Sequence, residues 1–154
     1  AVMIKGGKAD VLSSTDFDEA DLPEAGDIGT YIMDPDGAVV RAGLVRHYAK
    51  REGLHQLDPR IAYLTGERIP RGCSGFEFIE AVPVKKLKAA LQSHDAGSLE
   101  ILVRGLDVDP DQLRKKLKLK GSRSMAVIMT RIGTKGIALL CGPRVVSSED
   151  NYAT

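Results

Sequence analysis

The fold is decided by residues 98–141, SLEILVRGLDVDPDQLRKKLKLKGSRSMAVIMTRIGTKGIALLC. The first apolar run, residues 99–103, predicts a strand, and the Asp109-Pro110 pair that follows a short turn predicts the start of a helix. Two further apolar runs, residues 125–132 and 136–141, predict strands joined by a glycine-containing turn. Since these closing runs are apolar on both faces, we expect them to be largely covered.

Three helices are predicted along the chain. The first has Asp34 as its N-cap and Gly53 as its C-terminal cap. The second begins at Pro83 and ends at Gly97, because proline suits the first helical turn and glycine suits the residue after the last one. The third helix lies in the stretch quoted above and is closed by Gly121.

Further strands are predicted outside that stretch, at residues 61–65 and 76–82, with a short one before Asp34. Helices and strands therefore alternate irregularly, with local hairpins. This order favours an α+β domain with a mixed β-sheet and about three helices over a doubly wound nucleotide-binding fold.

The sequence also predicts a domain organisation. Residues 1–13 contain two short apolar runs around Gly6-Gly7, which is typical of a β-hairpin. Residues 14–28 are acidic and poor in large apolar side chains, and we expect an extended, poorly ordered linker there. Residues 29–145 would form the main α+β domain, and residues 146–154 a disordered tail.

Composition excludes several function classes. With 154 residues, 43% of them hydrophobic, the chain is long enough for one ordinary core. No apolar run approaches the roughly 20 residues of a membrane span, so we expect a soluble, cytoplasmic protein without a membrane partner. Cys73 and Cys141 lack the spacing of a zinc site or a disulfide framework, and Asp107 with Asp109 is weak evidence for a metal. No catalytic, cofactor-binding or metal-binding residue is predicted.

Charge is strongly segregated along the chain. Residues 10–36 contain nine acids and no Lys or Arg, which leaves 12 acids against all 22 basic residues elsewhere. A balance of about +10 outside that acidic segment indicates a polyanionic partner. The alternative is that the lysines and arginines only solvate helix surfaces.

The basic segment at residues 114–123 is the best candidate for binding. Its expected ligand is the phosphate backbone of structured RNA. Cations displace condensed counterions from phosphates, and no aromatic residue lies in residues 98–141 to stack on unpaired bases. The predicted RNA-binding residues are Arg104, Arg114, Lys115, Lys118, Lys120, Arg123 and Arg131.

Four motifs carry a family resemblance: YIMDPDGAVVRAG (31–43), QLDPRIAYLTGER (56–68), VRGLDVDPDQLRKKL (103–117) and AVIMTRIGTKGIALLC (126–141). Together they resemble the C-terminal region, called the THUMP-like domain, of bacterial class I S-adenosylmethionine-dependent methyltransferase-like proteins. The N-terminal hairpin is similar to the last strands of the methyltransferase domain in that family.

The resemblance implies that the full-length protein is an S-adenosylmethionine-dependent methyltransferase and that this chain is an accessory domain without catalytic or cofactor-binding residues. Related THUMP domains help RNA-modifying enzymes to grip structured RNA, particularly tRNA, so structured RNA and the upstream methyltransferase domain are the expected partners. The alternative is a protein-interaction or dimerisation domain that packs on the catalytic domain without contacting RNA. Its basic face would then meet an acidic surface, such as the segment 10–36.

Overall fold

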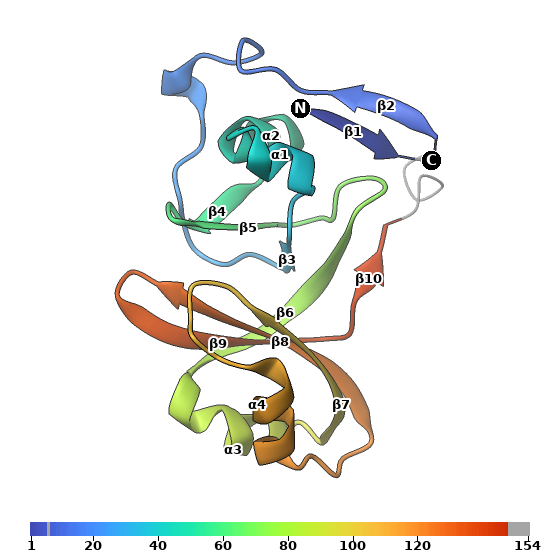
Figure 1. Cartoon of the computed structure of the whole chain (residues 1–154), viewed down its shortest axis with the longest axis vertical. Coiled ribbons are helices and arrows are strands. Elements are labelled where there is room, and N and C mark those ends of the chain that lie inside the picture. The colour runs from blue at the N-terminus through green and yellow to red at the C-terminus, as the bar shows by residue number, and fades with distance from the viewer. Residues whose placement is uncertain (6, 148–154) are drawn as a thin grey trace. The chain divides into compact units, whose positions relative to one another are not determined.

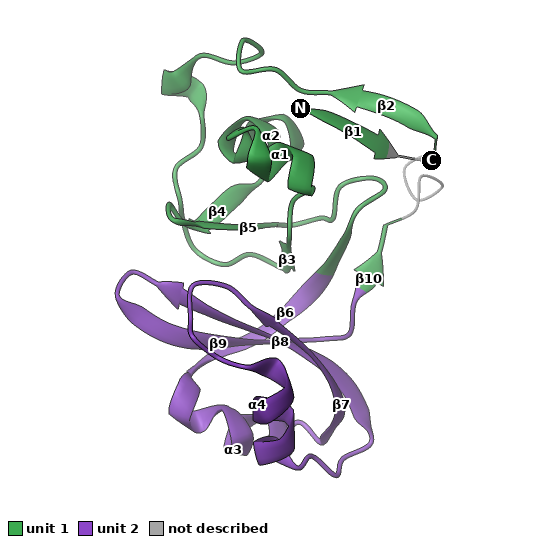
Figure 2. Cartoon of the chain, in the orientation of Figure 1, with its two compact units in different colours: residues 1–75, 145–154 green, residues 76–144 purple. Residues whose placement is uncertain are grey.

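The computed structural model describes residues 1–5 and 7–147, which form an α+β fold divided into two compact units (Figures 1 and 2). Unit 1 contains Ala1–Gly75 and the described residues from Val145 onward, and unit 2 is Phe76–Arg144. The chain leaves unit 1 within strand β6 (Ser74–Pro83) and returns at β10 (Val145–Val146). The division therefore falls inside residues 29–145, which the sequence predicts as one domain.

Unit 1 contains two antiparallel sheets, two helices and a 3-10 turn. The first sheet is the hairpin β1–β2, and the second has the order β4-β5-β3 followed by the first residues of β6, which β10 also pairs. The elements of unit 1 besides β6 and β10 are β1 (Val2–Lys5), β2 (Lys8–Val11), η1 (Glu19–Asp21), β3 (Tyr31–Met33), α1 (Gly37–Arg41), α2 (Val45–Glu52), β4 (His55–Asp58) and β5 (Ile61–Gly66).

The first predicted helix begins later than expected and is broken in two. Asp36, not Asp34, is the N-cap, and its carboxylate accepts the N–H of Ala38 at 2.8 Å. Gly43 adopts φ +71°, a left-handed conformation that ends α1 and lets α2 start in a new direction. Gly53, with φ +73°, ends α2 as predicted.

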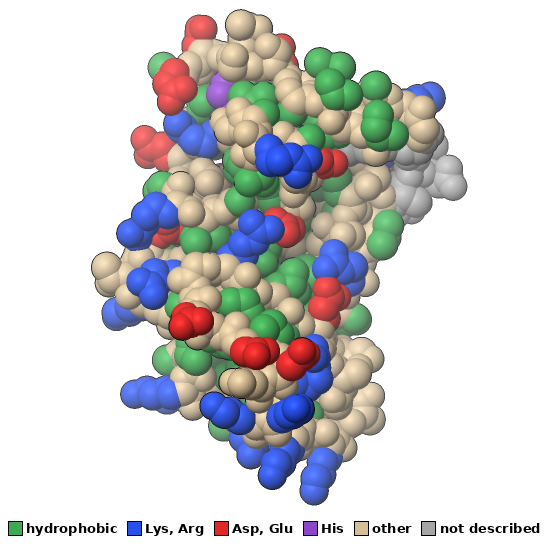
Figure 3. Space-filling view, in the orientation of Figure 1, with side chains coloured by type: hydrophobic (Ala, Val, Ile, Leu, Met, Phe, Trp, Pro, Cys, Tyr) green, Lys and Arg blue, Asp and Glu red, His purple; other side chains and the backbone are tan. Residues whose placement is uncertain are grey.

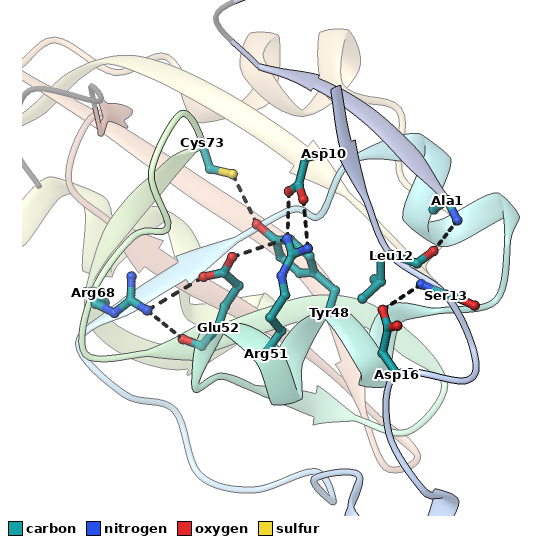
Figure 4. A network of polar contacts seen from close by, with 10 residues as sticks. All are labelled: Ala1, Asp10, Leu12, Ser13, Asp16, Tyr48, Arg51, Glu52, Arg68 and Cys73. Carbon is teal, nitrogen blue, oxygen red and sulfur yellow. Dashed lines mark hydrogen bonds and ion pairs between the residues drawn. The ribbon is translucent and has the colours of Figure 1, made fainter. Parts of the chain in front are cut away.

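The predicted N-terminal hairpin is confirmed, and one of its faces belongs to the core of unit 1. Met3 and Leu12 are 1% exposed and pack with Tyr48, Leu64 and other buried residues. Figure 4 shows the polar network that also joins the hairpin to α2. Unit 1 is therefore organised around α2, with the hairpin on one side and the β4-β5-β3 sheet contributing to the same core.

The acidic segment 14–28 is in contact with α2. Leu22 is buried, and the Nε of Arg46 donates to the carbonyl oxygen of Pro23 at 3.2 Å. Arg46 also forms an ion pair with Glu19 at 2.9 Å. These contacts attach the segment that the sequence predicts as a linker to the second helix of unit 1.

Unit 2 is a four-stranded mixed sheet, in the order β6-β9-β8-β7, with helices that pack on it. Strands β7 and β8 are parallel and the other pairs are antiparallel. The predicted fold class, α+β with a mixed sheet, is thereby confirmed. The elements of unit 2 besides β6 are η2 (Val84–Lys86), α3 (Leu87–Ser93), β7 (Ala96–Val103), α4 (Pro110–Leu117), β8 (Arg123–Ile132) and β9 (Lys135–Cys141).

Helix α4 crosses from the end of β7 to the start of β8, as a parallel strand pair requires. Asp109 is its N-cap, as predicted, and accepts the N–H of Asp111 at 2.9 Å. The predicted end at Gly121 is wrong, because Lys118 adopts φ +47° and terminates the helix after Leu117.

The two glycines expected to end helices in this unit serve close packing instead. Gly97 lies in β7, where a Cβ would come within 2.0 Å of the carbonyl oxygen of Gly121. A Cβ on Gly121 would come within 2.1 Å of the carbonyl oxygen of Asp95. The start of β7 and the approach to β8 therefore touch through their backbones.

The C-terminal segment has more structure than its sequence indicates. Val145 and Val146 pair with Gly75 and Ser74, and the N–H of Ser147 donates to the carbonyl oxygen of Cys73 at 2.9 Å. The remaining residues of the predicted tail, 148–154, lie outside the described residues.

Candidate functional site

The two units carry opposite formal charge. Unit 2 has 13 Lys and Arg against 7 Asp and Glu, whereas unit 1 has 9 against 14. Figure 3 shows Lys and Arg side chains gathered at the end of unit 2 that carries α3 and α4. The excess of positive charge that the sequence indicates is therefore a property of unit 2.

All seven predicted RNA-binding residues are exposed, but they do not form one cluster. Arg123 and Arg131 lie near opposite ends of β8, and at about 3.3 Å per residue their backbones are about 26 Å apart. Arg104 belongs to the far end with Arg131, because its N–H donates to the carbonyl oxygen of Met129 at 2.9 Å. The other predicted residues lie on α4 or between α4 and β8: Arg114, Lys115, Lys118 and Lys120.

Arg114 has partners within unit 2. Its Nη1 lies 3.3 Å from Asp111 Oδ1, and its Nη2 donates to the carbonyl oxygen of Leu99 at 3.2 Å. The side chain thus holds α4 against edge strand β7. A structural role explains Arg114 at least as well as a ligand contact does.

A pocket of about 490 Å³ lies where α3 approaches the loop between α4 and β8. Three of its lining residues are lysines, and one of these, Lys88, is outside the predicted set. The lining residues are Lys88, Gln92, Asp95, Ala96, Lys118, Lys120 and Gly121.

Sequence reasoning missed Lys88 because the side chain belongs to a different helix from the basic segment. Residues 85–88 look like the solvated face of that helix, and nothing local places them near residues 118–120. One signal was present: Lys88 and Gln92 are four positions apart, so they share one face of α3, while Leu87 and Leu91 are buried on another.

Three residues that line the pocket, Asp95, Ala96 and Gly121, belong to a hydrogen-bonded junction between the start of β7 and the approach to β8. The N–H of Gly121 donates to the carbonyl oxygen of Ala96 at 3.0 Å, and that of Arg123 donates to the carbonyl oxygen of Asp95 at 2.9 Å. The Asp95 carboxylate accepts both the hydroxyl of Ser122, at 2.6 Å, and its backbone N–H, at 3.3 Å. The lysines therefore share the pocket with backbone that is fixed by hydrogen bonds.

The lining has a positive formal charge. Hydrogen bonds from the Ser122 hydroxyl and then from its backbone N–H hold the pKa of Asp95 below its ordinary value, so this carboxylate is ionised at neutral pH. Three lysines and one aspartate leave a formal charge of +2. Within residues 1–5 and 7–147, no acid or acceptor pairs with the ammonium groups of Lys88, Lys118 and Lys120.

A second pocket, of about 380 Å³, lies between α4 and β7 and shares Lys118 with the first. Its lining comes from two elements. The C-terminal part of α4 and the residues after it contribute Arg114, Leu117 and Leu119, and the start of β7 contributes Gly97, Ser98 and Leu99. Basic groups consequently line both sides of the C-terminal end of α4.

The two cysteines lie in different surroundings. Burial raises the pKa of the Cys141 thiol to about 12, and Cys73 Sγ lies 3.2 Å from the hydroxyl of Tyr48. The described part of the chain contains no group of three or more His, Cys, Asp or Glu placed to hold a metal ion. None of the helices in that part is both long and apolar enough to cross a membrane.

Comparisons with known proteins agree with the predicted resemblance. Residues 73–143, nearly all of unit 2, match the family model described as THUMP domain-like. Two proteins of Mycobacterium tuberculosis, from strains CDC 1551 and H37Rv, are each 53% identical to the chain over 121 residues. Each is named an uncharacterized S-adenosylmethionine-dependent methyltransferase, and the alignment covers 75% of this chain and 34% of the relative.

A solved structure has the same fold. The crystal structure of a candidate methyltransferase from Porphyromonas gingivalis W83 superposes with a TM-score of 0.61 at 24% identity, over 79% of this chain and 31% of that one. The chain thus spans about a third of the length of the relatives it matches. Residues 73–143 are similar to THUMP-like domains, in a chain that is related to proteins named as S-adenosylmethionine-dependent methyltransferases.

Proposed function

We propose that this chain is the substrate-docking part of a cytoplasmic S-adenosylmethionine-dependent methyltransferase and that unit 2 binds structured RNA, with tRNA as the first candidate. One observation carries the proposal: exposed lysines from α3 and from the loop before β8 line one pocket of a unit with an excess of six positive charges. Such a surface releases counterions when it meets a phosphate backbone.

The aromatic residues of unit 2 favour recognition of a folded backbone over single-stranded bases. They are Phe76, which is 1% exposed, and the half-buried Phe78. The guanidinium of Arg144 lies over the Phe76 ring, 4.7 Å from its centroid. Because Phe76 is buried and Phe78 is half-buried, unit 2 offers no fully exposed aromatic ring for base stacking, which favours contacts to phosphates and to RNA shape.

The methyl donor has no fitting site in the lysine-lined pocket. S-adenosylmethionine carries a sulfonium cation, which the three lysines would repel. When bound, this cofactor supplies the methyl group. We assign its binding and the catalytic residues to the two thirds of the relatives' length that this chain does not cover, and we assign substrate docking to the chain itself.

Binding of tRNA to the chain at several salt concentrations tests the proposal. We expect binding at low salt and a linear fall of log affinity with log salt concentration, since phosphate contacts dominate. Replacing Lys115, Lys118 and Lys120 together by Gln should lower the affinity for RNAs of different sequence by about the same factor. Absence of binding at low salt, or affinity that does not change with salt, would contradict the proposal.

A second candidate function, docking onto another part of the protein, is favoured by the N-terminal hairpin. Val2, Ile4 and Val11 are 56%, 69% and 65% exposed and share the face opposite Met3 and Leu12. In a longer protein that covers this face, Ile4→Ser and Val11→Ser should lower the free energy of unfolding by about 1–2 kcal/mol each. In the present chain the same changes should cost much less, and equal losses in both proteins would argue against docking through the hairpin.

A further inference from the structure

We propose that the pocket between α3 and the α4–β8 loop holds one phosphate group of the bound RNA, with Lys88, Lys118 and Lys120 as its cationic contacts. The inference rests on the proposed function and assigns it a specific anchoring point. The proposed main contact is therefore not the basic segment alone but a site formed jointly by α3 and the α4–β8 loop.

The position of Lys88 is set by the core. Leu87 and Leu91 on α3 are 2% and 0% exposed, so the rotation of this helix about its axis is fixed by burial. That rotation places Lys88 and Gln92 side by side on the pocket wall. A phosphate there receives a cationic contact from Lys88 and an N–H donor from the Gln92 amide.

The opposite wall is equally constrained. Lys118 has a left-handed backbone, and Gly121 packs so closely on Asp95 that no side chain fits between them. Lys120 lies between these two fixed points. Because the backbone on this wall is held in place, anion binding orders lysine side chains without ordering a flexible loop, so less conformational entropy is lost.

The charge and size of the pocket suit an internal phosphodiester group of an RNA strand. Its formal charge of +2 exceeds the single charge of an internal phosphodiester, and Asp95 is directed toward Ser122 by two hydrogen bonds. A volume of about 490 Å³ also leaves space for the sugars on either side of the phosphate. A carboxylate of an acidic protein is the competing occupant, and the experiment below distinguishes the two.

The test compares Lys88→Gln with Lys85→Gln in the full chain. Each change removes one exposed lysine from the η2–α3 segment, at positions three residues apart, but only Lys88 lines the pocket. We expect Lys88→Gln to weaken tRNA binding about fivefold at low salt and to reduce the salt slope by about one. Lys85→Gln should change affinity less than about twofold, and both variants should unfold at the same temperature as the parent chain.

Three outcomes would overturn the proposal, each in a different way. If the two substitutions have equal effects and the parent chain binds RNA, the phosphate site in the pocket is contradicted and the proposed RNA-binding function is not. If the parent chain does not bind RNA, both the phosphate site and the proposed RNA-binding function are contradicted. Displacement of RNA by polyglutamate as effectively as by an unlabelled RNA of equal charge, with the same dependence on Lys88, would assign the pocket to a protein carboxylate.

Discussion

Arg51 on α2 donates two hydrogen bonds to Asp10 on β2, from Nη1 to Oδ1 at 2.9 Å and from Nη2 to Oδ2 at 2.8 Å (Figure 4). The same guanidinium lies over the ring of Tyr48, 5.4 Å from its centroid, and 3.3 Å from Glu52 Oε1. Hydrogen bonds to both carboxylate oxygens fix the direction as well as the distance between two groups. The hairpin is therefore held to α2 by a defined polar contact in addition to its buried side chains.

Asp10→Asn should lower the free energy of unfolding by about 1 kcal/mol, because one charged partner is lost from a pair that is about a third exposed. Urea unfolding followed by circular dichroism measures the change. Asp18→Asn is the matched control, since the Asp18 side chain makes no capping hydrogen bond, and should stay within about 0.5 kcal/mol of the parent chain. Equal losses would show that the Asp10–Arg51 contact contributes nothing.

Gly121→Ala should destabilise unit 2 by about 3 kcal/mol or more, because the new Cβ would overlap a carbonyl oxygen that is fixed in the backbone. Gly97→Ala should behave similarly. The control is Gly142→Ala, where the nearest atom to a new Cβ is 4.0 Å away and the loss should be about 0.5 kcal/mol or less. Thermal unfolding of the three variants, ranked in that order, checks the close approach, and a mild effect at Gly121 would contradict it.

Asp109→Ala should cost about 1 kcal/mol of stability, since the carboxylate accepts N–H groups at the start of α4. Asp107→Ala removes the same charge two residues earlier, outside the helix, and should be nearly neutral. Chemical unfolding of the two variants distinguishes a capping role from a general effect of charge. Matching losses would assign the effect to charge alone.

Asp95 should make the fold sensitive to acid. Its pKa lies below the ordinary 3.8 in the folded state, so the ionised carboxylate stabilises the fold above pH 3.8, and this contribution is lost as the pH falls through the folded pKa. Ser122→Ala removes the hydroxyl donor and should return the pKa toward 3.8. NMR titration of the Asp95 carboxyl carbon in the acid range measures the shift.

Ser124→Ala serves as the control for that titration. The hydroxyl of Ser124 bonds that of Ser98 at 2.8 Å, so its removal should leave the pKa of Asp95 unchanged. A Ser122→Ala variant in which Asp95 still titrates as in the parent chain would show that the hydroxyl is not the cause.

Local patterns predicted the elements of residues 98–141 because each signal acts within a few residues. The apolar runs gave β7, β8 and β9, and the Asp109-Pro110 pair gave the start of α4. The Asp34-Pro35-Asp36 sequence was ambiguous, since either acid can cap a helix, and only the backbone geometry selects Asp36. Strand β4 was missed because its four residues, HQLD, have little β character and depend on pairing with β5.

The candidate site could be predicted only in part for the same reason. Lys118 and Lys120 stand out as local basic residues, whereas Lys88 joins them only through the packing of α3. Gly97 and Gly121 look like helix ends because glycine favours such positions, yet their contact with each other is a tertiary property. Interactions between distant parts of the chain, which no window of sequence contains, decide which lysines act together.

The pairing of Val145 with Gly75 makes unit 2 an insertion in topological terms. The chain departs and returns at neighbouring positions on adjacent antiparallel strands, about 5 Å apart between Cα atoms. Joining Gly75 to Val145 by a two-residue hairpin turn would therefore excise Phe76–Arg144 without altering the register of β6 with β10. The boundaries of the THUMP-like family match, 73 and 143, fall within two residues of this crossing, so we expect that Phe76–Arg144 can be deleted from the chain, or inserted into a hairpin of another protein, as one unit.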